Sequence, residues 1–506
     1  MARIIVSYYK IQEVSIGKIL CFWDGFIHEL KKYGNEVFVI NTAYFNPYNS
    51  NVVSSQKLNN HLLDRAKAFD PELIITFNHR IPKSFLDYFD VPIIIWDGDE
   101  LSFFCDHSYM KKNLDRYKIF SISKGWLQDY KDFGFSNNQI FYVPQATAIQ
   151  KMDCIQTMNI SFLGIRHFHN KRFEALIKTH KYKNNFYFLV KDFLNTGNYD
   201  YEELFNKYFQ HDYPELVMPL RDLYPLFDYR WLTLANMLDL GLTISGHDSR
   251  WEDVAEYMPQ LAAAYHPQQI WTLEENNWFY NSSKISLCPV TAQARGTAFS
   301  WRVFDIMASN ACLLISEASD LKKLTKDYLE IPMYKTPWEA RELSKKILAD
   351  EEYRKQIVKA SQKYVDENAR WIHRFRDMEN IIGIRIVNEE CTGKIYNVIL
   401  DDPEIINLVK ISSPSKVIAG ASFNEKSKIS FKVKKLLTKC LSINKAIEIL
   451  EISALILLLG VSIIISTSDK WLQILGNILC WTGIGSLMAS IVLFCIKIHR
   501  KIKCLK

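Results

Sequence analysis

The sequence lacks several common signatures of enzyme chemistry. Its ten cysteines form no Cys-x-x-Cys pair and no cluster with histidine, which excludes the usual zinc and redox motifs. It has neither a Gly-x-x-x-x-Gly-Lys-Ser/Thr loop nor a Gly-x-Ser-x-Gly elbow, so P-loop and α/β-hydrolase chemistry are not indicated. The apolar run at the beginning is too short for a signal peptide. We therefore expect free thiols and a main body in the cytoplasm.

Charge is unevenly distributed over the 506 residues. The net charge is +6, but the stretch from Lys426 to Lys445 holds seven lysines and no acid, and residues 497–506 hold five more basic side chains. Without these two stretches the chain is mildly acidic, which argues against nucleic acid as a partner. The first basic stretch, with its interspersed apolar residues, is typical either of a segment lying on an anionic lipid surface or of a solvated helix.

Two long uncharged runs follow that basic stretch. Residues 452–468 and 471–496 contain no charged side chain, and only Asp469 and Lys470 separate them. At about 1.5 Å per residue, each run is near the length needed to cross a hydrocarbon layer of roughly 30 Å. The flanking lysines place both ends in the cytoplasm. The sequence therefore predicts a transmembrane hairpin over 446–498 and a basic tail over 499–506; two buried core helices are the alternative.

The first 150 residues alternate short apolar runs with stretches of helical spacing. A helix is predicted from Ile16 to Leu30, with Gly34 as its C-terminal stop. Fully apolar strands between amphipathic helices indicate a parallel sheet covered on both faces, which is the α/β class. The predicted strands are 4–6, 37–40, 73–76, 92–96 and 119–122.

A second series of the same kind begins near Asn159. Two successive doubly wound units predict a ligand cleft between them, at the carboxyl ends of the strands. The expected domains are 1–150, 151–380 and a connector with the basic amphipathic segment over 381–445. The second series comprises strands 160–163, 186–189, 242–245, 284–288 and 311–315, and helices 230–240, 300–309 and 337–379.

Two consecutive segments carry a family resemblance. Lys284-Ile-Ser-Leu-Cys-Pro-Val is followed by Phe299-Ser-Trp-Arg-Val-Phe-Asp-Ile-Met-Ala-Ser-Asn-Ala-Cys-Leu-Leu-Ile-Ser. Together they resemble GT-B glycosyltransferases of group 1, in particular the CgeB-like spore-maturation group. Segments 126–144, 159–164 and 230–247 agree in order. The resemblance implies a first domain for the acceptor and a second domain for a nucleotide-sugar, over roughly 1–380.

The donor site is predicted on three loops of the second domain. Gly164 follows a strand, with Arg166 behind it, and Gly246 ends another strand, with His247 beside it. Glycine-loop amides and cations suit a diphosphate, although a simple strand–helix turn is the alternative. The third loop contains Arg295, Gly296 and Thr297.

The helix after the third loop carries the Arg-x-x-Asp step of the resemblance. Arg302 is expected to brace the loop or the phosphates, and Asp305 to accept hydrogen bonds from ribose; a carboxylate placed for the helix N-terminus is the alternative. Retaining relatives commonly have two glutamates eight positions apart. Here these positions hold Thr297 and Asp305, so the resemblance leaves the stereochemistry open.

The acceptor domain offers Asp97-Gly98-Asp99 after an apolar run. The spacing permits a metal-binding Asp-x-Asp motif, but GT-B enzymes generally need no metal, so we predict none. Asp99, or otherwise Asp97, is the candidate general base for the acceptor hydroxyl, with capping of a turn as the alternative. The secondary candidates are Asp24, His28, His79 and His107.

These features predict a glycosyltransferase at the inner face of the cytoplasmic membrane. It would transfer sugar from a nucleotide-sugar, with a UDP-linked sugar as the expected donor, to a lipid-linked or surface-polysaccharide acceptor, without a cofactor. An anchored cleft raises the effective concentration of a membrane substrate. The alternatives are a sugar-nucleotide epimerase and a non-catalytic scaffold in a polysaccharide assembly complex.

Overall fold

A computed structural model describes most of the first 397 residues, and these residues all belong to one compact unit, Met1–Ala419. Within them, no helix is both long enough and apolar enough to span a bilayer. The predicted basic segment, the hairpin at 446–498 and the tail at 499–506 lie outside the described residues. The described ranges are 2–8, 19–42, 53–164, 183–197, 201–209, 230–246, 258–266, 270–290, 294, 296–328 and 330–397.

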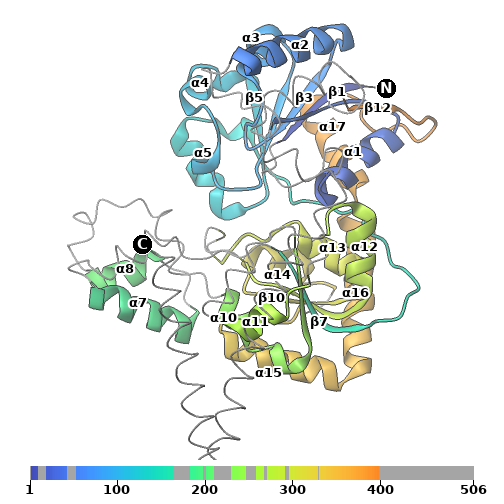
Figure 1. The fold of residues 1–506 in the computed structure, drawn as a ribbon. Helices are drawn as coiled ribbons and strands as arrows, with labels where there is room; N and C mark the ends of the chain where they lie inside the picture. The colour runs from blue at the N-terminus through green and yellow to red at the C-terminus, as the bar shows by residue number, and fades with distance from the viewer. Residues whose placement is uncertain are drawn as a thin grey trace, which may run out of the picture. The chain divides into compact units, whose positions relative to one another are not determined.

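The first half of the unit is built on a parallel sheet of seven strands in the order β12-β2-β1-β3-β4-β5-β6 (Figure 1). All its neighbouring pairs are parallel. Every residue of β3 and β4 is buried, as expected for strands covered on both faces. The strands are β1 (Arg3–Tyr8), β2 (Glu36–Asn41), β3 (Leu73–Phe77), β4 (Ile93–Trp96), β5 (Tyr117–Ser121), β6 (Ile140–Tyr142) and β12 (Lys394–Asn397).

Helices cover this sheet, and the predicted α/β class is confirmed. The first helix, α1, is followed by Gly34 at φ +85°, a backbone conformation that favours glycine and ends the helix where the sequence predicts. The helix begins at Cys21, later than the predicted Ile16, and residues 9–18 are not described. The helices of this half are α1 (Cys21–Lys32), α2 (Val53–Phe69), α3 (Lys83–Tyr88), α4 (His107–Lys112) and α5 (Leu127–Phe133).

The second half is built on a parallel sheet of five strands in the order β11-β10-β9-β7-β8. After β7 the chain adds β8 on one side and then crosses to add β9 on the other. This reversal is the topological switch point of doubly wound folds, where ligands bind at the carboxyl ends. The strands are β7 (Met158–Leu163), β8 (Leu242–Ser245), β9 (Ser283–Cys288), β10 (Cys312–Ser316) and β11 (Met333–Tyr334).

One predicted strand of this half is wrong. Residues 186–189 lie in helix α7, where Phe186, Leu189 and Phe193 are buried while Tyr187 and Phe188 are exposed. That burial has the period of a helix, which an apolar run of only four residues cannot reveal. The helices are α7 (Lys183–Thr196), α8 (Tyr201–Phe209), α10 (Arg230–Ala235), α11 (Pro259–Ala263), α12 (Leu273–Asn281), α13 (Arg302–Ala308), α14 (Ser319–Thr325), α15 (Pro337–Ala349) and α16 (Glu351–Asn368).

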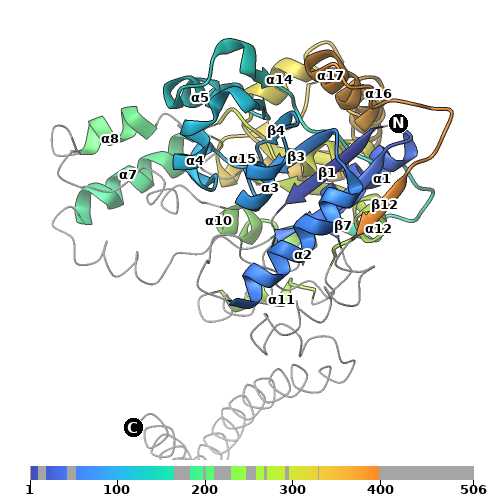
Figure 2. The same cartoon turned by 90° about the horizontal axis from the view of Figure 1, so that it is seen from above.

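The chain returns to the first half after α16. Helix α17 (Trp371–Ile382) packs beside α1, and its residues Trp371, Phe375 and Met378 belong to the first hydrophobic core (Figure 1). Strand β12 then pairs with β2 at the edge of the first sheet (Figure 2). The last helix of the second series therefore completes the first half.

A substitution of Trp371 tests whether α17 packs on the first half. It is 1% exposed and contacts Phe22, Phe26 and Trp96 of the first half. We expect Trp371→Ala to lower the free energy of unfolding by about 3–5 kcal/mol, because it leaves a large cavity. Urea titration of the full chain measures this, and Trp338→Ala is the control, since Trp338 is 50% exposed on α15. Equal effects of the two substitutions would contradict the assigned packing.

Candidate functional site

Loops at the carboxyl ends of strands in the two halves touch each other. Ser123 Oγ, just after β5, lies 3.2 Å from Thr297 Oγ1, in the loop that follows β9. The amide of Lys124 donates to Asp320 Oδ2 at 2.9 Å. A Cβ on Gly125 would lie 2.6 Å from Thr297 Oγ1, so a side chain there would have to displace the Thr297 hydroxyl. Thr297, predicted as a donor-site residue, therefore contacts the first half.

A second contact between the halves involves the beginning of α1. The amide of Cys21 donates to the carbonyl of Trp271 at 2.7 Å, and the amide of Leu273 donates to Asp24 Oδ2 at 3.2 Å. Asp24 also pairs with His28 at 3.0 Å, and this hydrogen bond raises the pKa of His28. Two secondary base candidates are thus engaged with each other.

The predicted glycine ends of β7 and β8 come together. The amide of Gly164 donates to the carbonyl of Ser245 at 3.0 Å, and a Cβ on Gly246 would lie 2.4 Å from the carbonyl oxygen of Gly164. A side chain therefore does not fit at Gly246 unless the backbone moves. Arg166, His247 and Arg295, which were predicted beside these glycines, lie outside the described residues.

Arg302 begins α13, and its guanidinium lies over the ring of Trp301, 5.5 Å from the centroid. Within the described part of the chain it forms no hydrogen bond and no ion pair. Trp301 packs on Phe22 and Trp23 of the first half, at centroid distances of 5.2 and 6.1 Å. An unpaired guanidinium held on an aromatic ring is suited to bind a phosphate.

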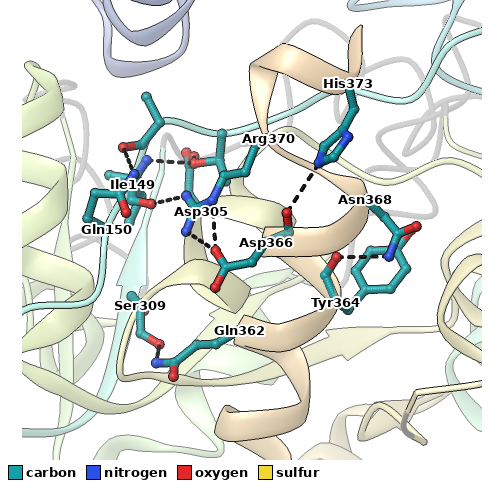
Figure 3. A network of polar contacts seen from close by, with 12 residues as sticks. Ile149, Gln150, Asp305, Ser309, Gln362, Tyr364, Asp366, Asn368, Arg370 and His373 are labelled. Carbon is teal, nitrogen blue, oxygen red and sulfur yellow. Dashed lines mark hydrogen bonds and ion pairs between the residues drawn. The ribbon is translucent and has the colours of Figure 1, made fainter.

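Asp305 lies one turn further along α13 and is only 4% exposed. Its Oδ1 accepts a hydrogen bond from Thr147 Oγ1, in the segment that joins the two halves (Figure 3). Burial raises the pKa of Asp305 to about 7, although the Thr147 hydrogen bond and the charges of Arg302 and Arg370 act in the opposite direction. In this arrangement Asp305 contacts the chain itself and is not open to a ribose.

Asp97 and Asp99, the two candidate bases of the first half, differ in their surroundings. Asp97 is 1% exposed; its Oδ1 accepts from the Ile122 amide at 2.8 Å and its Oδ2 from Tyr130 Oη at 2.6 Å. Burial raises the pKa of Asp97 to about 7. Asp99 is half-buried, and its Oδ2 accepts from Asn78 Nδ2 at 2.8 Å. Asp99 is thus the more accessible carboxylate, in keeping with its preference as the base.

The remaining histidine candidates have structural partners. His79 is buried, with Nδ1 2.6 Å from the carbonyl of Cys105 and Nε2 3.2 Å from Tyr117 Oη. Burial lowers the pKa of His79 to about 4. His107 Nε2 lies 2.9 Å from the carbonyl of Leu101. Among the described residues, no group of three His, Cys, Asp or Glu side chains is placed to hold a metal ion.

Sequence reasoning missed the residues that join the halves. Thr147, Ser123 and Asp320 are common polar residues outside any motif, and each meets its partner only through folding. Trp301 did have a signal, since it directly precedes Arg302 within the quoted family segment. An aromatic residue next to a predicted phosphate ligand can be recognised in the sequence, although the family motif does not include it.

The buried carboxyl of Asp305 predicts a dependence of stability on pH. Its pKa of about 7 in the folded chain exceeds the ordinary 3.8, so the folded state keeps a proton that the unfolded chain has lost. We expect the free energy of unfolding of the wild type, minus that of Asp305→Asn, to fall as pH rises from about 4 to about 7. Urea titrations at several pH values measure this difference.

The comparison with Asp305→Asn cancels the opposite contribution of His79, whose pKa is lowered by folding. Asp90→Asn, at an exposed position, is the control and should give a difference that hardly varies with pH. A constant difference for Asp305→Asn as well would contradict the buried, protonated carboxyl.

Residues 229–380 match the family described as "Glycosyl transferase-like". No curated protein matches the chain. Similar solved structures include a glycosyltransferase from Rickettsia africae (11% identity, TM-score 0.43, covering 75% of this chain and 97% of that one) and WaaG, a glycosyltransferase involved in lipopolysaccharide biosynthesis (9%, 0.41, 75% and 100%). Another is Anabaena HepE in complex with UDP and glucose (9%, 0.43, 76% and 100%). The family match, which includes all of α13, supports the expected enzyme class.

Proposed function

We propose that this protein is a GT-B glycosyltransferase that transfers sugar from a nucleotide-sugar, UDP-linked, to a lipid-linked or surface-polysaccharide acceptor. The observation that carries the proposal is Arg302, a cation that begins α13 inside the glycosyl transferase-like segment and forms no ion pair with the described residues. It lies in the half whose switch point, between β7 and β9, is the expected place for a nucleotide.

The chemistry of such a transfer needs positioning and charge stabilisation. The anomeric carbon is attacked by an acceptor hydroxyl while the nucleoside diphosphate leaves with its negative charge. Arg302 would bind that diphosphate and stabilise its charge, and the carboxyl ends of β7 and β8, at Gly164 and Gly246, would lie beside it. Holding both reactants in line supplies much of the rate enhancement. We propose that no metal is required.

Asp99 is the proposed general base. It follows β4 at the carboxyl edge of the first sheet, next to the loop after β3. Asn78 holds one carboxylate oxygen, and the same Asn78 side chain accepts from the amide of Gly98 at 2.7 Å. These two hydrogen bonds of Asn78 would fix the direction of the Asp99 carboxylate. A general base needs such a fixed position because it must lie within hydrogen-bond reach of its substrate.

The acceptor and the location are inferred from the sequence beyond residue 397. The uncharged runs 452–468 and 471–496 and the surrounding lysines support an anchor in the cytoplasmic membrane, with the α/β unit on its inner face. A tethered enzyme meets a lipid-linked acceptor at high effective concentration. This is why we propose a membrane-linked acceptor rather than a free sugar.

A non-catalytic scaffold is the second candidate, and one observation favours it. The positions of the usual glutamate pair hold Thr297 and Asp305. The Thr297 side chain contacts the first half, and the Asp305 side chain contacts the segment that joins the halves. A scaffold of this kind need not bind nucleotides. Binding of a nucleoside diphosphate therefore distinguishes the two functions, and product analysis distinguishes the transferase from a sugar-nucleotide epimerase.

Arg302 gives the direct test. We expect UDP or a UDP-sugar at about 100 times its Kd to stabilise the full chain by about 2.7 kcal/mol. Arg302→Ala should weaken binding roughly 10–100-fold, because a hydrogen bond to a charged group contributes about 1.5–3 kcal/mol. Calorimetry measures both effects. Arg376→Ala, an exposed arginine on α17, is the control and should bind like the wild type. Wild-type binding by Arg302→Ala would overturn this site.

The assignment of the base is tested by comparing the two aspartates. Asp99→Asn should reduce kcat about 10²-fold or more with little change in stability, because it removes a proton acceptor at a half-buried position. Asp97→Ala should instead lower the free energy of unfolding, by about 1–3 kcal/mol for each buried donor left unpaired. Transfer assays and urea titrations give the two readouts. Unchanged kcat in Asp99→Asn would remove it as the base.

A further inference from the structure

The chain passes between the two halves twice, and the two passages lie against each other. The amide of Thr147, in the first passage, donates to the carbonyl of Ala369, in the second, at 3.0 Å. Thr147 and Arg370 form an isolated parallel bridge, and the Arg370 guanidinium donates to the carbonyl of Ile149 (Figure 3). Asp366 holds that guanidinium with contacts of 3.0 and 2.7 Å. Hydrogen bonds therefore connect the two passages to each other.

The side chain of Thr147 connects helix α13 to these two passages. Its Oγ1 donates to Asp305 Oδ1 and accepts from the Ile149 amide at 2.9 Å. The hydroxyl has only one proton, and it donates this proton to Asp305. The hydrogen bond that the hydroxyl accepts from the Ile149 amide helps to fix the direction of that donation. Both Thr147 and Asp305 are almost fully buried, so water does not compete for the contact.

The contact is not an economical source of stability. Asp305 is a buried carboxyl without an ion pair among the described residues, and burying such a group costs free energy. An apolar side chain at this buried position would avoid that cost. In some proteins a buried polar contact of this kind sets geometry rather than adding stability.

The Thr147–Asp305 contact affects the position of Arg302. Arg302 and Asp305 are three residues apart on α13, so they lie on neighbouring positions of one helix face. Helix α13 has only seven residues, and Arg302 and Asp305 lie within one turn of each other at its start. A restraint on Asp305 is therefore a restraint on the start of the helix, where the guanidinium lies over Trp301.

We infer that Asp305 is a positioning residue: by accepting the Thr147 hydroxyl, it fixes Arg302 relative to the two passages between the halves, so that diphosphate binding depends on a contact outside the donor pocket. This inference rests on the proposed function. It also assigns Asp305 a role different from the ribose contact that the family resemblance implies. Asp305 acts on the ligand only through α13.

The test uses Thr147 rather than Asp305, because Thr147 is outside the predicted donor site. The full chain is titrated by calorimetry with UDP, GDP and ADP, and the tightest binder is then used on the variants. We expect Thr147→Val, which keeps the shape and loses the hydroxyl, to weaken binding about tenfold. Thr147→Ser keeps the hydroxyl and should restore wild-type affinity.

Thermal unfolding without nucleotide separates positioning from instability. A Thr147→Val variant that unfolds close to the wild-type temperature and binds about tenfold more weakly supports the inference. Wild-type affinity in Thr147→Val, with binding lost in Arg302→Ala, would overturn the inference and leave the proposed function standing. Equal weakening in Thr147→Ser would also overturn it. Failure of the wild type to bind any of the three diphosphates would overturn the proposed function, and the inference with it.

Discussion

The double passage of the chain between its two α/β halves is the constraint on which the rest of the structure depends. The first passage runs through Thr147 and the second through Ala369 and Arg370, and backbone and side-chain hydrogen bonds join them. The second passage then delivers Trp371 into the aromatic core of the first half. The loops at the strand ends of the two halves also contact each other, for example through Ser123 and Thr297.

The fold could be predicted wherever the sequence pattern is local. Strand β8 was predicted at its exact residues, and β2, β3 and β9 within one residue, because parallel strands buried on both faces are short apolar runs. The apolar run 186–189 gave the wrong answer, since its helical period appears only when burial is known. The return of α17 and β12 to the first sheet was missed as well. Pairing Lys394 with Glu36 is a contact across the whole chain that no local pattern encodes.

The candidate site divides in the same way. Gly164 and Gly246 were predicted from their places after strands, and Arg302 from the family motif; the structure places the two glycines side by side. Asp305 was predicted from a motif, but its surroundings depend on Thr147, 158 positions away. The same holds for Asp97, whose partners Ile122 and Tyr130 come from the next strand and helix. Residue type and spacing thus predict position in the fold, whereas burial and partner decide what a carboxyl does there.

The edge strand β12 has a consequence for how the protein is made. Synthesis runs from the first residue onward, yet the first sheet receives its seventh strand, and its core receives Trp371 and Phe375, only after the entire second half has been translated. At the ribosome, residues 1–150 therefore wait with the edge of β2 unpaired and apolar surface uncovered, a state that is prone to aggregation. The order in which the segments emerge differs from the order in which the halves are completed, and the half that starts first finishes last.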